Sequence, residues 1–222
     1  MNRTSKLAVF VILFILLSTY LPNNKTDKKS LLFQIKKIEI ENNNITSVRD
    51  LMLDLNSLKG KNLLFLNHKT IEQIISKFDF ILSFRVKKIF PNTLKIIVLE
   101  KKLVALHVKG KNKFYISKNG DLIEYLYIKR FENLPLVIGN QKNFVKLYDK
   151  LKIVQFPLKE VKSYNYQDID RWDLVLKSGK LIKLPKNNYI ESLKNFLRIK
   201  DNKNFENYQI FDYRIKDQLI LN

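Results

Sequence analysis

The sequence predicts an α+β protein with a single N-terminal transmembrane helix, a β-α-α-β-β module and a second, β-rich module with two helices. Three observations support this fold class. No charged residue occurs between Lys6 and Lys25. Further along the chain, apolar residues recur at the spacing of one helix face. Around these segments, short apolar runs end at turn-forming residues, as strands do.

The apolar segment from Leu7 to Leu21, with Phe14 at its centre, is predicted to be an uncleaved membrane anchor. Eleven of its fifteen residues are Leu, Ile, Phe or Val, a composition that favours insertion into a bilayer. As a helix it is about 22 Å long against a hydrocarbon core of about 30 Å, so its polar flank is expected to complete the span. A cleaved signal peptide is the alternative, but no small-x-small cleavage site follows.

The segments around the anchor predict the topology. Residues 1–6 form a head, residues 7–24 the anchor and residues 25–30 a polar linker. Basic residues lie on both sides of the anchor in similar number, so the flanking charge does not decide the orientation. Because the head is too short to hold a domain, we expect it in the cytoplasm and the remaining chain outside it.

Residues 31–102 are predicted to form the β-α-α-β-β module. A strand is expected over Ile35–Glu41. Ser47, with an acid three residues later, is typical of a helix start, and Gly60 is typical of a helix end. Asn67 can cap a second helix. Two further strands are expected over Ser83–Phe90 and Thr93–Lys101.

Residues 103–222 are predicted to form the β-rich module. Asn119-Gly120 is the clearest hairpin signal, because both residues tolerate positive φ. Helices are expected over about Asn143–Ile153 and Tyr189–Ile199. Leu134–Gly139 is expected to be a short edge segment. The other expected strands are Val104–Lys109, Lys113–Ser117, Asp121–Glu124, Val161–Tyr166, Trp172–Lys177, Leu181–Leu184, Gln209–Arg214 and Gln218–Leu221.

Composition excludes several classes of site. The absence of cysteine excludes a disulfide scaffold, a Cys-ligated zinc site and a thiol nucleophile. Two histidines, His68 and His107, are too few for a multi-histidine metal site. The five glycines stand too far apart for a nucleotide-binding loop. No nucleophile–base pair stands out either, so we expect neither a cofactor nor an enzyme.

The net charge of +20 has two explanations. One is a nucleic acid or anionic-surface partner. The other is a set of solvated lysine faces, which the even distribution favours: residues 31–102 carry 13 basic and 7 acidic groups, and residues 103–222 carry 23 and 13. We expect no nucleic-acid partner. A membrane-tethered module that binds an anionic polymer stays as the alternative function, and strong salt dependence would identify it.

Several short motifs follow one another in a specific order. In the first module they are Lys37–Glu41, Leu58–Leu64, Val86–Ile96 and Leu99–Lys101. In the second they are Asn119–Asp121, Leu134–Gly139, Arg171–Leu174 and Asp212–Arg214. Together with the anchor, this order resembles the FtsQ/DivIB family of bacterial cell-division proteins. The resemblance implies that residues 31–102 are a POTRA-like domain and residues 103–222 the β domain of that family.

The resemblance also implies a function. It implies a non-enzymatic scaffold of the divisome in the bacterial inner membrane, with its main domains in the periplasm and enriched at the division site. It implies that the β domain binds the small single-pass proteins FtsB and FtsL, that the POTRA-like domain contributes to recruitment, and that the open edge of the last strand receives a partner strand. The residues carried over to this edge and its flank are Arg214, Ile215, Lys216, Asp217, Gln218, Leu219, Ile220 and Leu221.

This sequence departs from the family at that edge. Ile215 stands where members often have an aromatic residue, and the sequence ends at Asn222 without the tail that some members have. We therefore expect weaker partner binding, or binding that depends more on the helix over Tyr189–Ile199. Burial of Leu219 and Leu221 in the core is the alternative to a partner-binding role.

Four other residues have simple structural interpretations. Trp172 is expected to anchor the core of the second module. Asp212 and Arg214 are expected to form a structural ion pair, and a role in setting the partner-binding edge is the alternative. Glu100, at the end of the first module, is expected to be a solvated end-of-strand residue, and a contact at the hinge between the modules is the alternative.

Overall fold

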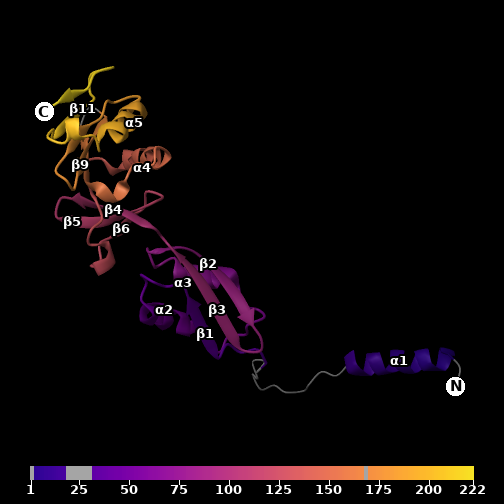
Figure 1. Cartoon of the computed structure of the whole chain (residues 1–222). Helices are drawn as coiled ribbons and strands as arrows, with labels where there is room; N and C mark the ends of the chain where they lie inside the picture. Colours follow the sequence, from indigo (N-terminus) through magenta and orange to yellow (C-terminus); the bar gives the residue numbers. More distant parts are fainter. Residues whose placement is uncertain (1–2, 19–31, 168–169) are drawn as a thin grey trace.

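The computed structural model describes residues 3–18, 32–167 and 170–222, which form one helix and two mixed α/β modules (Figure 1). Helix α1 covers Arg3–Ser18 and contains Leu7 and Phe14. Leu21, the end of the predicted anchor after residue 18 and the predicted linker 25–30 lie outside the described residues. Within the described part of the chain, no helix combines the length and the apolar character needed to cross a membrane.

The first module has the predicted β-α-α-β-β order. Its three-stranded sheet has the order β1-β3-β2, in which β3 pairs parallel with β1 and antiparallel with β2. The helices connect β1 to β2, and a short 3-10 turn follows the first of them. The elements are β1 (Lys37–Glu41), α2 (Val48–Leu55), η1 (Asn56–Leu58), α3 (His68–Ile75), β2 (Ile81–Ile89) and β3 (Thr93–Glu100).

Both helices of this module begin where the sequence predicts. The Ser47 hydroxyl accepts a hydrogen bond from the backbone N–H of Asp50, and the Asn67 side chain accepts one from that of Lys69. Each bond satisfies a donor that the first helical turn leaves free. The apolar faces of the helices pack on the sheet in a core that includes Leu51, Leu55, Ile71, Ile75, Leu94 and Ile96.

The second module is built on a nine-stranded sheet with the order β12-β11-β10-β9-β8-β7-β4-β5-β6. The predicted hairpin at Asn119-Gly120 is confirmed, since β5 and β6 pair antiparallel on either side of it. The strands are β4 (Leu103–Lys109), β5 (Asn112–Ser117), β6 (Leu122–Glu124), β7 (Leu136–Ile138), β8 (Val161–Gln167), β9 (Arg171–Leu176), β10 (Leu181–Lys183), β11 (Ile210–Asp212) and β12 (Ile220–Leu221), and the two α-helices are α4 (Phe144–Ile153) and α5 (Tyr189–Ile199).

The two helices of the second module lie on the same side of the sheet (Figure 1). Helix α4 connects the parallel strands β7 and β8, and α5 connects the parallel strands β10 and β11. Such crossovers are nearly always right-handed. Both step across the sheet in the same direction, so the rule places α4 and α5 on one face.

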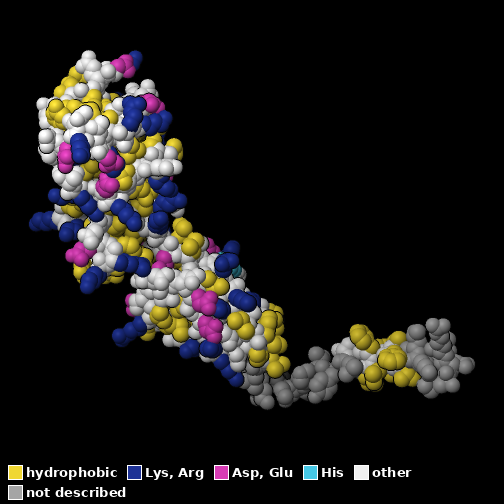
Figure 2. All heavy atoms as spheres, viewed as in Figure 1, with side chains coloured by type: hydrophobic (Ala, Val, Ile, Leu, Met, Phe, Trp, Pro, Cys, Tyr) yellow, Lys and Arg dark blue, Asp and Glu magenta, His cyan; other side chains and the backbone are white. Residues whose placement is uncertain are grey.

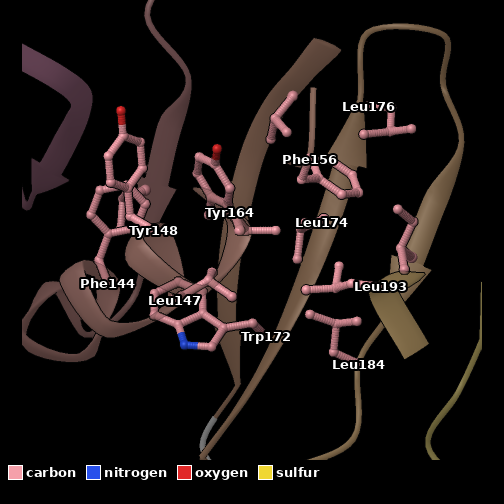
Figure 3. Packing of buried hydrophobic residues seen from close by; sticks show 14 of the residues in the cluster. Phe144, Leu147, Tyr148, Phe156, Tyr164, Trp172, Leu174, Leu176, Leu184 and Leu193 are labelled. Carbon is pink, nitrogen blue, oxygen red and sulfur yellow. The ribbon is translucent and has the colours of Figure 1, made fainter. Parts of the chain in front are cut away.

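The main core lies between this face of the sheet and the helices (Figure 3). From α4, Phe144 and Leu147 point at the sheet, and Leu193 of α5 lies further along the same layer. Trp172 is 5% exposed and its ring lies 6.2 Å from that of Phe144, so the predicted core role of this tryptophan is confirmed. Burying rings of this size is a large source of stability for the module.

The expectation that Leu134–Gly139 forms an edge segment is wrong. Strand β7, within this segment, lies inside the sheet between β4 and β8 and is parallel to both. One face of the strand is buried, with Val137 fully buried, whereas Ile138 on the other face is 48% exposed. Pro135, just before the strand, accepts a hydrogen bond from Leu106 N–H through its carbonyl.

Gly139 ends β7 in a conformation that only glycine adopts easily, with φ +89. A Cβ atom there would lie 2.9 Å from the carbonyl oxygen of Tyr166. We therefore expect Gly139→Ala to lower the free energy of unfolding by about 3 kcal/mol in denaturant titration. Gly110→Ala is the control, because Gly110 has φ +62 and open space around it, so only about 1 kcal/mol is expected. Equal losses would contradict the prediction.

A small apolar junction connects the two modules. Leu103, Tyr115 and Ile123 of the second module are buried there, and Ile45 and Phe80 of the first module pack against them. The ring centroids of Phe80 and Tyr115 are 6.2 Å apart. The modules therefore share packed side chains as well as the short link between β3 and β4.

The expectation that Glu100 is a solvated end-of-strand residue is wrong. Its carboxylate accepts hydrogen bonds from three consecutive backbone N–H groups, those of Asn44, Ile45 and Thr46, at 2.7–2.9 Å. These groups belong to the loop between β1 and α2 that carries Ile45 into the junction. Glu100 therefore fixes a loop of the first module at its border with the second.

Candidate partner-binding edge and groove

The C-terminal strand β12 lies at an edge of the nine-stranded sheet, with β11 as its neighbour on the inner side. The structure thus brings the last predicted strand to the predicted position. The strand is shorter than expected, since only Ile220 and Leu221 of the predicted Gln218–Leu221 pair with β11. An edge strand presents main-chain donors and acceptors that another strand can use.

The residues before β12 form a turn rather than an extended edge. Gln218 N–H donates to the Ile215 carbonyl at 3.3 Å, and Asp217 has φ 59. Asp tolerates this left-handed conformation better than most residues. The predicted partner-binding segment from Arg214 to Leu221 therefore consists of a loop over residues 214–219 and a two-residue strand.

The side chains of this segment divide into exposed and packed ones. Ile215 and Ile220 are 50% and 41% exposed. Leu219 and Leu221 are half-buried against the main core. Leu219 and Leu221 are thus partly core residues, as the alternative interpretation expects. Ile215 and Ile220 supply the accessible apolar surface.

The hydrogen-bond pattern decides which groups of β12 face outward. Ile210 N–H donates to the Asn222 carbonyl at 2.8 Å, and Asn222 N–H donates back to Ile210 at 3.2 Å. Along an antiparallel ladder, hydrogen-bonded and non-hydrogen-bonded residue pairs alternate. The pair of Ile220 and Asp212 is therefore hydrogen-bonded, whereas the pair of Leu221 and Phe211 is not. The N–H and C=O groups of Leu221 therefore point away from β11, toward the open edge.

A groove with a volume of about 880 Å³ lies beside this edge, between helix α5 and the loop over residues 214–219. One polar face of α5 forms a wall, with Glu191, Lys194, Asn195 and Arg198 at i, i+3, i+4 and i+7. The sequence predicts a binding role for the helix over Tyr189–Ile199 only as a whole. The regular spacing of these polar residues, opposite the buried Leu193 and Phe196, is the signal that could have identified this wall.

Tyr213 joins the two walls of the groove. It is buried, and its hydroxyl donates a hydrogen bond to the Asn195 side chain at 3.0 Å. Burial raises the pKa of Tyr213 well above its usual range, so the hydroxyl stays protonated and remains a donor. The loop after β11 is therefore attached to α5 through a neutral, buried hydrogen bond.

The predicted ion pair between Asp212 and Arg214 is present. The Arg214 Nε lies 2.8 Å from one carboxylate oxygen of Asp212 and 2.9 Å from the other, and the Arg214 backbone N–H also donates to Asp212. Asp212 is buried, whereas the guanidinium is partly exposed. The Arg214 guanidinium lowers the pKa of the Asp212 carboxyl. The pair fixes the start of the loop and presents one cation at the groove.

A second carboxylate, Asp173, lies on the strand next to β10 and behaves in the opposite way. It is buried, accepts a hydrogen bond from Gln167 at 3.0 Å and has the Arg171 guanidinium 3.5 Å away. Burial outweighs these partners and raises the pKa of Asp173. Its charged form is therefore disfavoured by folding, whereas that of Asp212 is favoured.

These opposite pKa shifts predict opposite effects of two matched substitutions. At neutral pH we expect Asp212→Asn to lower the free energy of unfolding by about 2 kcal/mol, because it leaves Arg214 without its carboxylate. The difference from the natural chain should shrink below about pH 4, where Asp212 of the unfolded chain becomes protonated. Asp173→Asn should leave stability unchanged or raise it at neutral pH, because it removes a buried charge. Urea titrations at several pH values give both results, and a loss at Asp173 equal to that at Asp212 would contradict the assignment.

The other singled-out residues lie away from the groove. His107 is buried on β4 with its Nδ1 3.1 Å from the Val137 carbonyl. His68 begins α3 and stacks on Phe84 at a centroid distance of 4.7 Å. Among the described residues, no three or more His, Cys, Asp or Glu side chains form a group that could hold a metal ion.

Comparison with known proteins adds to this geometry. A family profile described as "POTRA domain, FtsQ-type" matches residues 33–101. A second, described as "Cell division protein FtsQ/DivIB, C-terminal", matches residues 105–214. The loop from residue 215 and strand β12 therefore lie beyond the matched range.

Whole sequences and a solved structure are also similar. The chain is 27% identical to the cell division protein FtsQ of Rickettsia felis, over 96% of this chain and 83% of that protein. It is 24% identical to the FtsQ of Rhizobium meliloti over 69% of this chain, and it spans only half the length of that relative. The extracytoplasmic domain of DivIB from Geobacillus stearothermophilus matches 48% of this chain and 96% of its own, at 16% identity and a TM-score of 0.34, which is too low to compare the folds.

Proposed function

Since the chain belongs to the FtsQ/DivIB family of bacterial cell-division proteins, we propose that it is a non-enzymatic scaffold of the divisome that links early and late division proteins. The observation that carries this proposal is the open edge of β12 beside the groove formed with α5. A partner that adds a strand to this sheet needs outward main-chain groups and exposed apolar side chains at the edge. A second segment of the same partner could then lie in the groove, against its polar wall.

We propose FtsB and FtsL as the partners at this site. In this arrangement a strand of the partner pairs with β12 through Leu221, while Ile215 and Ile220 contact its side chains. The groove carries the cations Lys194, Arg198, Arg214 and Lys216 against the anions Glu191 and Asp217, so acidic groups on the partner would be favoured there. The POTRA-like module would take part in recruiting further division proteins.

The membrane topology is part of the proposal. Residues 1–6 would lie in the cytoplasm, residues 7–24 would anchor the chain in the bacterial inner membrane, and residues 25–30 would link the anchor to periplasmic domains over residues 31–102 and 103–222. Support comes from the uncharged segment between Lys6 and Lys25, most of which lies in helix α1. Large C-terminal domains translocate largely regardless of flanking charge.

The net charge of +20 supports one alternative, a tethered module that binds an anionic polymer. On the face seen in Figure 2, Lys and Arg side chains are spread over both modules and interspersed with Asp and Glu. A polymer-binding site would gather them into one stripe. Retention of the full chain on a polyanion resin should therefore fall smoothly with salt and show no preference for one polymer.

Depletion of the chain in its host tests the proposed function. A divisome scaffold is expected to give filamentous cells that elongate without septa, and a fluorescent fusion is expected at the division site. The Asp173→Asn chain is expected to complement the depletion, because Asp173 does not line the groove. Normal division after complete depletion, or an even distribution around the cell, would overturn the proposal.

A further inference from the structure

The end of the first module that contains residue 32, the first described residue after the gap at 19–31, is formed by three segments, residues 32–36, 59–66 and 87–92. Hydrogen bonds hold them together. Leu63 N–H donates to the Phe33 carbonyl at 2.8 Å, and Lys36 N–H donates to Asn92 at 2.9 Å. The Lys88 ammonium donates to the carbonyls of Leu64 and Leu66. Hydrogen bonds to the other segments therefore fix the position of each segment at this end.

Large apolar side chains of these segments remain exposed. Phe65 is 85% exposed, Leu32 71% and Phe90 50%, and Leu64 and Ile89 are also exposed. We call these five residues the basal patch. Figure 2 shows hydrophobic side chains gathered at this end of the module. Exposed apolar groups concentrated in this way usually mark a surface that contacts a partner or a membrane.

All charged residues of these three segments are basic. The segments contain Lys36, Lys59, Lys61, Lys87 and Lys88 and no Asp or Glu. Four of these lysines are exposed, while Lys88 is used for the carbonyls above. Aromatic and aliphatic side chains surrounded by lysines are typical of surfaces that rest on the headgroups of an anionic bilayer.

The length of chain before the patch sets how far it can be from the anchor. Fourteen peptide steps separate Ser18, the last residue of α1, from Leu32. Fully extended, they reach about 50 Å. If α1 lies in the bilayer, the basal patch is the part of the two modules nearest to it along the chain.

We propose that the basal patch docks on the anionic surface of the membrane in which the chain is anchored. Phe65, Leu32 and Phe90 enter the headgroup region, and the exposed lysines pair with lipid phosphates. The docking rests on the proposed anchor. It would hold the POTRA-like module at the membrane and present the second module away from it.

Site-specific fluorescence on the full chain tests this docking. The sequence has no cysteine, so Phe65→Cys, Ile153→Cys and Phe14→Cys each give a single labelling site for an environment-sensitive dye. The chains are reconstituted in nanodiscs of phosphatidylglycerol and phosphatidylcholine that contain a nitroxide lipid. Ile153, at the end of α4 in the second module, is 73% exposed and serves as the control.

We expect the dye at position 65 to be quenched about threefold more strongly than the dye at 153, and this excess to disappear in phosphatidylcholine alone. Lys59→Glu with Lys61→Glu should abolish it as well. The matched reversal Lys109→Glu with Lys111→Glu, in the β4–β5 turn, should not.

Three outcomes would overturn the docking. Equal quenching at 65 and 153, with position 14 quenched, would show an anchored chain whose patch does not touch lipid. A dye at position 65 whose emission shows shielding from water, without quenching by the nitroxide lipid, would show that residues 19–31 or a second copy cover the patch. An unquenched dye at position 14 would instead overturn the anchor, and the docking with it.

Discussion

Replacing Glu100 with alanine is expected to lower the free energy of unfolding of the first module by about 3 kcal/mol. Its carboxylate is the acceptor for the N–H groups of Asn44, Ile45 and Thr46. Removing it leaves these donors facing a site that the junction side chains partly close to water. Thermal and urea unfolding of the full chain, followed by a probe in the first module, measure the loss.

Two variants sharpen this prediction. Glu100→Gln keeps one acceptor oxygen but no charge, so an intermediate loss is expected. Glu124→Ala removes an exposed carboxylate from β6 and should change the free energy by less than about 0.5 kcal/mol. A loss at Glu100→Ala as small as that at Glu124→Ala would show that the three hydrogen bonds do not hold the loop.

Leu221→Pro is expected to weaken binding of the proposed partner about tenfold or more while lowering the stability of the chain no more than Leu221→Ala does. Proline has no N–H, and the N–H of Leu221 points to the open edge rather than to β11. Proline is tolerated on an edge strand in this orientation. A partner strand would lose one main-chain hydrogen bond and meet the proline ring.

The controls for this prediction distinguish the loss of the backbone N–H from the loss of the side chain. Leu221→Ala removes the half-buried side chain but keeps the donor, so it should bind better than Leu221→Pro. Ile220→Pro removes an N–H that faces Asp212 inside the sheet and should destabilise the module instead. Quantitative pull-down of FtsB with each chain, alongside melting temperatures, gives the result. Equal binding by Leu221→Pro and Leu221→Ala would argue against strand addition.

The elements of the first module were predictable because their signals are local. Ser47 and Asn67 cap helices through bonds that span two or three residues, and the apolar faces of α2 and α3 follow the helical period. The hairpin at Asn119-Gly120 is equally local. These features depend on a few neighbouring residues, so one sequence is enough to predict them.

The features that could not be predicted from the sequence depend on residues far apart in the chain. Glu100 binds a loop more than fifty positions earlier, and the residues around it left open both a solvated residue and a hinge contact. Strand β7 is inside the sheet because it pairs with β4 and β8, and a single sequence does not show which strands pair. The groove combines α5 with the loop after β11, and β12 is limited to two residues by the turn at Asp217.

Photo-crosslinking in the host cell tests the central claim most directly. A photoreactive residue is placed at Ile215, which is half exposed and lines the groove, or at the control position Ile153 on α4. We predict that position 215 captures a small single-pass division protein of the FtsB or FtsL type and that position 153 does not. Capture of that protein at neither position, or at both equally, would contradict a partner-binding site at the C-terminal edge.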